Sequence, residues 1–178
     1  IMAALGLFNW NRLAAINGNL QGIYRNDLQH LVQVETAIVA AFRVRVNVLR
    51  HTLATDPALE ADARQAIDTY DRQVADALRR LSEAGGLTDD ERELIRATQE
   101  SWGAYRQARD GVLQLSAAGQ KDQARQAALT GQGGQRFGQA VENLQQLVEF
   151  QTAGVERAYA ESQQAYDLAI WLTLGLPV

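Results

Sequence analysis

The sequence predicts an all-α protein, an elongated antiparallel up-down four-helix bundle with long first and fourth helices and a shorter hairpin of the second and third. Three observations predict this fold class. Apolar residues recur at helical spacing along most of the 178 residues. The only prolines are Pro57 and Pro177, so no proline breaks a helix in the long stretch between them. Helix-capping signals divide the chain into four segments.

The first helix is expected from about Leu5 to Ala54, ending before Thr55. Asp56 is a good N-cap for the next helix, and Pro57 suits the first position of that helix. The apolar stripe expected to face the core consists of Leu20, Ile23, Leu28, Leu31, Val34, Ile38, Phe42, Val46, Leu49 and Leu53.

The second helix is expected from about Pro57 to Ala84, where Gly85-Gly86 indicates a left-handed C-terminal cap. Thr88 and Glu91 have the spacing of a capping box and open the third helix. That helix is expected to run to about Ala118 and to be closed by Gly119. The expected core positions are Leu59, Ala63, Ile67, Tyr70, Val74, Leu78 and Leu81 in the second helix and Leu94, Ile95, Trp102, Tyr105, Val112 and Leu115 in the third.

The fourth helix is expected from about Asp122 to the C-terminus, with an interruption at Gly131–Gly134. Its expected stripe consists of Phe137, Val141, Leu144, Val148, Val155 and Tyr159. The first and fourth helices would each have about 50 residues, or roughly 75 Å at 1.5 Å per residue. Since short connections make neighbouring helices antiparallel, both chain ends are expected at the same end of a rod.

Both ends of the chain are apolar, over Ile1–Phe8 and Leu168–Val178. Neither run reaches the roughly 20 residues of a membrane span. We interpret the chain as a single domain over 1–178, with 1–10 and 168–178 as truncated ends of flanking transmembrane helices. Trp10 and Trp171 would then lie near the membrane interface, where tryptophan is enriched. The alternative is that these are apolar helix ends of a soluble protein.

Composition argues against several classes of function. Cysteine is absent, which removes disulfides, thiolate metal sites and cysteine nucleophiles. The net charge of −4 argues against a nucleic-acid partner. The two histidines, His30 and His51, lie far apart on one helix, and no phosphate-binding loop, dinucleotide fingerprint or nucleophile elbow is present. We therefore expect neither an enzyme nor a cofactor or metal site.

Three arginines lie close together in the first helix, at Arg43, Arg45 and Arg50. Arg43, Asn47 and Arg50 share one helical face, whereas Arg45 continues an apolar heptad and would be costly to bury unpaired. Two interpretations stay open from the spacing. Either these are surface arginines with one salt bridge to another helix, or they converge on a carboxylate ligand, with arginines of a partner subunit.

The sequence resembles the four-helix-bundle ligand-binding domain of methyl-accepting chemotaxis receptors, the family of the enteric aspartate and serine receptors. The resemblance covers nearly the whole chain. It is based on the long–short–short–long helix layout, on Arg45-Val46-Asn47-Val48-Leu49-Arg50, and on the small-residue-glycine turn 118–124. It implies a homodimer that binds a small ligand between the two copies of the first helix, with Arg45 and Arg50 binding ligand carboxylates.

The chain also departs from the family pattern. Ala54 stands where the aspartate receptor has a third arginine, and Arg43 or His51 could replace it. The stretch that opens the fourth helix, 124–130, is mostly aliphatic, with a single hydroxyl at Thr130. An organic or aromatic acid without an amino group therefore fits better than an amino acid. Thr130 and Gln132 are further candidate contacts.

The resemblance implies the periplasmic domain of a membrane-anchored chemoreceptor in the inner membrane, which would signal by a small helix displacement. Two alternatives stay open. The same fold could be the sensor of a histidine kinase, or it could be a structural or docking bundle without a small-molecule ligand. Trp102, Tyr105 and Tyr70 are expected in the core rather than against a ligand.

Overall fold

The computed structural model describes residues 28–174, with side chains as far as residue 168. The expected first part of helix one, the apolar run Ile1–Phe8, Trp10 and the side chain of Trp171 lie outside the described residues. The chain divides into two compact units, one comprising Val32–Glu149 and the other comprising Ile1–Leu31 together with Phe150–Val178.

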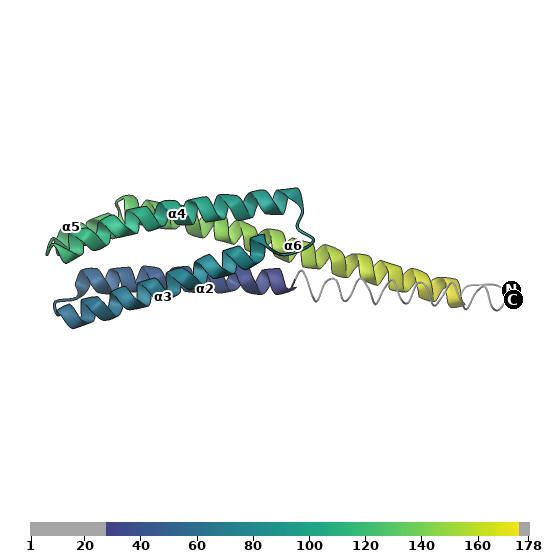
Figure 1. The fold of residues 1–178 in the computed structure, drawn as a ribbon. Coiled ribbons are helices and arrows are strands. Elements are labelled where there is room, and N and C mark those ends of the chain that lie inside the picture. Colours follow the sequence, from purple (N-terminus) through teal and green to yellow (C-terminus); the bar gives the residue numbers. More distant parts are fainter. Residues whose placement is uncertain (1–27, 175–178) are drawn as a thin grey trace. The chain divides into compact units, whose positions relative to one another are not determined.

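The described helices are α2 (Leu28–Leu53), α3 (Pro57–Ser82), α4 (Asp89–Ala117), α5 (Lys121–Leu129) and α6 (Gln132–Leu174). In the unit Val32–Glu149 they form an antiparallel four-helix bundle, in which α5 and the first part of α6 together make the fourth helix (Figure 1). The described residues contain no β-strand. The predicted fold class is confirmed.

The helix boundaries follow the local cap signals. Asp56 is the N-cap of α3 and accepts a hydrogen bond from the Ala58 backbone N–H, and Pro57 is the first helical residue. Thr88 and Glu91 form the predicted capping box of α4. At the other end of α4, Gly119 has φ +78°. These three caps are confirmed.

The end of α3 differs from the prediction by two residues. The helix ends at Ser82, with Glu83 as its C-cap. Of the two glycines, only Gly86 takes a left-handed conformation, with φ +81°. The left-handed turn thus lies in the loop to α4, where it is followed by the buried Leu87.

The glycine patch separates α5 from α6 and allows the two helices to meet closely. A Cβ at Gly133 would lie 2.9 Å from the carbonyl oxygen of Ala127, and one at Gly134 would collide with the carbonyl oxygen of Leu129. Residues with side chains cannot occupy such positions without a shift of the backbone. The predicted interruption is confirmed, but Gly133 and Gly134 lie within the first turn of α6.

The core of the bundle contains two clusters of buried side chains. The larger is built around Val44, Ile67, Tyr105 and Leu144, and the smaller around Leu81. Most predicted core positions of α3, α4 and α6 are buried or half-buried, but Leu59 and Tyr159 are about half exposed.

The predicted stripe of the first helix is partly wrong. Phe42, Val46 and Leu53 are exposed, and smaller side chains of α2 face the core instead. The buried side chains of α2 in the bundle include Val34, Ala37, Ala40, Ala41, Val44 and Val48. The first helix is apolar on two faces, and its partners in the bundle pack against the face with the smaller residues, which allows close helix approach.

The second unit is described at 28–31 and 150–174. Its part of α6 exposes Tyr159, Tyr166 and Leu168, and the Gln163 amide donates to the Tyr159 hydroxyl at 3.2 Å. No helix within residues 28–174 has a stretch long and apolar enough to cross a membrane.

Candidate functional site on α2

Helix α2 carries an exposed apolar seam as well as its buried face. We define the seam as Val32, Val39, Phe42, Val46, Leu49 and Leu53. Its members other than the half-buried Leu49 are between 46% and 62% exposed. From Val39 onward the steps alternate between three and four residues, which is the heptad pattern of a two-helix contact. Glu35 interrupts the seam between its first two members.

Arg43 and Arg50 lie beside the seam on one side. The Arg43 guanidinium carbon lies 5.2 Å from the centroid of the Tyr70 ring on α3. Arg50 Nη1 donates to Asn47 Oδ1 at 2.7 Å, and Asn47 Nδ2 donates to the Arg43 carbonyl at 2.8 Å. The shared face predicted for Arg43, Asn47 and Arg50 is present as this hydrogen-bonded row.

Arg45 lies on the other side of the seam and reaches α6. Its guanidinium carbon lies 5.2 Å from the centroid of the Phe137 ring, and its Nη1 is buried without a hydrogen-bond partner. The Tyr105 hydroxyl on α4 is also buried, and among the described residues it makes no hydrogen bond of good geometry, although it interacts with the Arg45 side chain. Burial raises the pKa of Tyr105 to about 12, although the positive charges of Arg45 and Arg109 oppose the rise. The phenol is therefore protonated at neutral pH.

Arg43, Arg45 and Arg50 make no ion pair with any acid in the described part of the chain. The interpretation of the cluster as arginines satisfied by a salt bridge to another helix is therefore not supported. A guanidinium presents five N–H donors in a planar fork that matches a carboxylate. The arrangement thus offers three guanidinium groups to an acid from outside the described residues.

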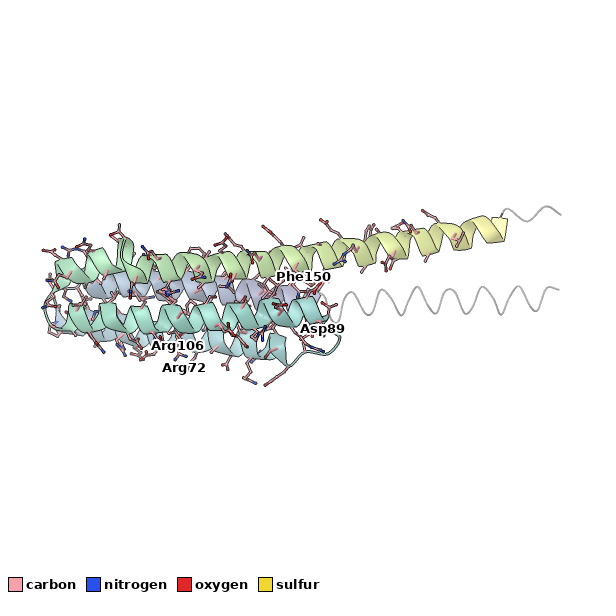
Figure 2. All side chains as sticks on the ribbon, turned by 90° about the horizontal axis from the view of Figure 1, so that it is seen from above. Arg72, Asp89, Arg106 and Phe150 are labelled. Carbon is pink, nitrogen blue, oxygen red and sulfur yellow. The ribbon has the colours of Figure 1, made fainter. Side chains whose placement is uncertain are left out.

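The arginines of α4 behave differently. Asp71 of α3 accepts from Trp102 Nε1 at 3.0 Å, and it is paired with the nearly buried Arg109 at 3.2 Å. Its second oxygen is paired at 3.0 Å with Arg106, whose place on the bundle is labelled in Figure 2. Arg109 is also bonded to Asp110. Trp102 and Tyr105 lie in the core, as the sequence predicted.

Thr130 and Gln132 lie where α5 gives way to α6, and both are exposed. The Thr130 hydroxyl donates to the Gln126 carbonyl within its own helix at 3.3 Å. No hydrogen bond joins either residue to the arginines of α2 in the described part of the chain. Their role in a site stays a prediction.

His51 does not supply the missing third cation. The residue is 5% exposed, and its Nδ1 lies 2.8 Å from Ser116 Oγ on α4. Burial lowers the pKa of His51, and the charges of Lys121 and Arg64 lower it further, while Glu60 raises it. Lys121 joins the same group, because its Nζ donates to the His51 carbonyl, to Ser116 and to Glu60. This network ties four helices together and leaves His51 neutral.

A shallow surface hollow of about 320 Å³ lies between α2 and α3, where Val32, Val39 and Arg43 contribute to its lining. It includes neither Arg45 nor Arg50.

No group of three or more His, Asp and Glu side chains within residues 28–174 is placed to hold a metal ion.

Sequence reasoning missed two features of this region. The helical pattern predicts Phe137 and Tyr105 as core residues, and nothing in their local sequence indicates that they lie near Arg45. The exposed seam was missed because the pattern predicts four of its residues to be buried, namely Phe42, Val46, Leu49 and Leu53. The heptad spacing of the seam is visible in the sequence. It differs from the spacing of the alanine-rich face of α2, so the sequence contains a signal that distinguishes the two faces.

Comparison with known protein families gives a match over most of the chain. The family model described as "Four helix bundle sensory module for signal transduction" matches residues 1–166, nearly the whole chain. No curated protein and no solved structure matches the chain.

Proposed function

Because the chain belongs to the family of four-helix bundle sensory modules for signal transduction in chemoreceptors, we propose that it is the ligand-binding domain of a chemotaxis receptor and that it senses a small carboxylate at a homodimer interface. The observation that carries the proposal is the set of three arginines on α2 that have no acidic partner among the described residues. The ligand would be an organic or aromatic acid without an amino group.

The seam supports the second copy of the chain as the partner. In a parallel pair of α2 helices, Val39, Val46 and Leu53 would occupy a positions, and Phe42 and Leu49 would occupy d positions. This contact would cover apolar side chains that are otherwise half exposed. A heptad seam of this kind is self-complementary, as a twofold-symmetric interface requires.

The same register would bring arginines of the two copies together. Arg45 falls at a g position and Arg50 at an e position, and a g residue of one parallel helix faces the e residue of the next heptad in its partner. Arg45 of one copy would therefore lie opposite Arg50 of the other, twice by symmetry. Two guanidinium groups repel each other unless an anion lies between them, and a carboxylate fits their fork geometry.

The charges around this position support the proposed ligand class. The described part of α2 between Thr36 and Leu53 contains no acid that could receive an ammonium group. At the start of the fourth helix, the Thr130 hydroxyl is bonded within its own helix. An acid without an amino group is thus better matched than an amino acid. Arg43, Asn47, Thr130 and Gln132 would be secondary contacts.

We further propose that the domain is extracytoplasmic, in the periplasm, and that the full receptor is anchored in the inner membrane. Ligand binding would displace α6 relative to α2 by a small distance, as in other receptors that signal through helix shifts. Protease protection of the full-length receptor in spheroplasts tests the placement. Cleavage of this domain from the cytoplasmic side only would contradict it.

The binding test is isothermal titration of the chain with succinate, citrate, benzoate and aspartate. At least one of the first three should bind, and Arg45→Ala and Arg50→Ala should each weaken that binding by about tenfold or more, since a hydrogen bond to a charged group contributes about 1.5–3 kcal/mol. Arg96→Ala, at an exposed arginine of α4, is the matched control and should bind as wild type does.

Each other outcome has a definite meaning. Binding of aspartate alone would keep the sensor function and overturn the ligand class. Equal binding by wild type and by both arginine variants would overturn the site. Failure of all four compounds to bind would favour a docking or structural bundle instead.

A further inference from the structure

Arg45 is the arginine of the α2 cluster whose ring contact reaches α6. Arg43 lies over Tyr70 of α3, and Arg50 is held by Asn47 in its own helix. Arg45 instead lies over Phe137, which is 9% exposed and sits in the second turn of α6. The arginine cluster therefore contacts the fourth helix through the Arg45 and Phe137 side chains.

The Phe137 ring is fixed from two sides. It meets Phe42 of the seam edge to face, with centroids 5.5 Å apart, and Tyr105 of α4 at 5.2 Å. Tyr105 in turn contacts Trp102 at 5.0 Å. This row of rings runs from the exposed seam into the core, so Phe137 cannot shift without disturbing neighbours on α2 and α4.

A guanidinium can bind a ring and a carboxylate at the same time. It uses its planar face for the ring and its edge for the N–H hydrogen bonds to an acid. Among the described residues, Arg45 Nη1 is buried and makes no hydrogen bond of good geometry, although the guanidinium lies close enough to the Tyr105 hydroxyl to oppose the rise in the pKa of that phenol. Buried donors of this kind are rare and costly, and a ligand oxygen would satisfy this one.

We propose that Phe137 is a positioning residue of the carboxylate site: its ring fixes the Arg45 guanidinium for the ligand and links ligand occupancy to the start of α6. This inference rests on the proposed function. The ring restricts a flexible side chain before the ligand arrives, which lowers the entropic cost of binding. Because Phe137 belongs to α6, a displacement of the Arg45 side chain on ligand binding would be passed to the fourth helix through this contact.

The test compares Phe137→Leu, which keeps an apolar side chain but removes the ring, with Phe137→Tyr, which keeps the ring. The probe is whichever of succinate, citrate and benzoate binds the wild-type chain. Phe137→Leu should weaken its binding about three- to tenfold, the range that corresponds to a partly desolvated cation–π contact. Phe137→Tyr should stay within about twofold of wild type.

The second readout is amide hydrogen exchange of 132–141, measured with and without the probe. The probe should slow exchange in wild type and in Phe137→Tyr but not in Phe137→Leu. Tyr70→Leu is the matched control, because it removes the ring under Arg43 at the same 5.2 Å distance but on α3. It should keep the probe-dependent slowing on α6. Phe137→Met replaces Phe137→Leu if the latter does not fold.

Two results would overturn the inference alone. The first is that Phe137→Leu binds the probe and exchanges its amide hydrogens as wild type does. The second is that the leucine and tyrosine variants lose equal affinity for the probe, which would indicate an effect of core packing rather than of the ring contact with Arg45. If no probe binds the wild-type chain, the proposed function fails and this inference falls with it.

Discussion

The two sides of the bundle use arginine in opposite ways. On the α3–α4 side, Arg106 and Arg109 are paired with Asp71, and Trp102 Nε1 also donates a hydrogen bond to that carboxylate. On α2, Arg43 and Arg45 lie over aromatic rings, and no acid within the described residues pairs with them. The same side chain thus stabilises the fold in one region and is left available in the other.

Apolar surface shows the same contrast. The apolar stripe of α4 is buried, whereas α2 keeps a second stripe, the seam, at about half exposure. An exposed stripe with heptad spacing is typical of helix-pairing surfaces. Under the proposed function, the arginines without an acidic partner among the described residues and the exposed seam form one binding surface, whereas the paired arginines of α4 serve the fold.

The largest expected effect is on the unfolding free energy, and it comes from the ion pairs between α3 and α4. Asp71→Ala removes the acid that compensates the nearly buried Arg109 and leaves Trp102 Nε1 without its acceptor. Breaking a buried pair in this way costs about 3–5 kcal/mol of unfolding free energy. Urea unfolding followed by circular dichroism measures it. Asp68→Ala, which breaks an exposed pair with Arg64, should cost less than about 1 kcal/mol. An equal loss of unfolding free energy in the two variants would show that burial does not determine how much these ion pairs stabilise the fold.

The next effect is on the seam. Val46→Asp places a charge at the centre of the proposed helix pair, and the two copies of it would face each other. The dimer dissociation constant should rise at least about tenfold by analytical ultracentrifugation, since two like charges would be buried unpaired. The helicity of the monomer should be unchanged, because Val46 is 55% exposed.

Leu59→Asp is the control for the seam variant, because Leu59 is a similarly exposed apolar residue on α3. If the Val46→Asp variant remains dimeric, or if Leu59→Asp weakens the dimer equally, the seam is not the dimer interface. The chain contains no cysteine, so Val46→Cys gives an independent check. A disulfide between two copies forms only if the two Val46 positions lie close together.

A smaller effect concerns the network that ties α2 to the paired side. Burial lowers the pKa of His51 below its ordinary value of 6.5, so the unfolded chain takes up a proton more readily than the folded one. His51 therefore costs no stability above about pH 6.5, and unfolding free energy should fall as the pH drops from 6.5 toward 5. Urea midpoints at several pH values measure this slope. His51→Gln should flatten it, and an unchanged slope would exclude His51 as its source.

The sequence predicted the parts of the fold that depend on near neighbours. Asp56 with Pro57, Thr88 with Glu91, and Gly119 each act within a few residues, so their cap geometry can be inferred without knowing the fold. The end of α3 was missed by two residues because Gly86 is left-handed in the loop rather than at the cap.

The face of α2 could not be chosen from the sequence in the same way. Val39 and Val46 have the spacing of core residues, and only packing against the other helices shows that Ala40 and Val44 are buried instead. The arginine cluster was found because charges in an apolar helix are visible locally. The contact of Arg45 with Phe137 joins residues far apart in the chain and has no local signal.

The smallest expected effect is the most direct test of the contrast. Arg50 is exposed, and among the described residues its side chain hydrogen-bonds only to Asn47 in its own helix, so Arg50→Ala should change the unfolding free energy by less than about 0.5 kcal/mol. The same variant should lose about tenfold or more in carboxylate affinity. An arginine that serves binding and not stability must show both results in one protein. A loss of stability as large as that of Asp71→Ala would instead place Arg50 with the structural arginines and end the distinction between the two sides.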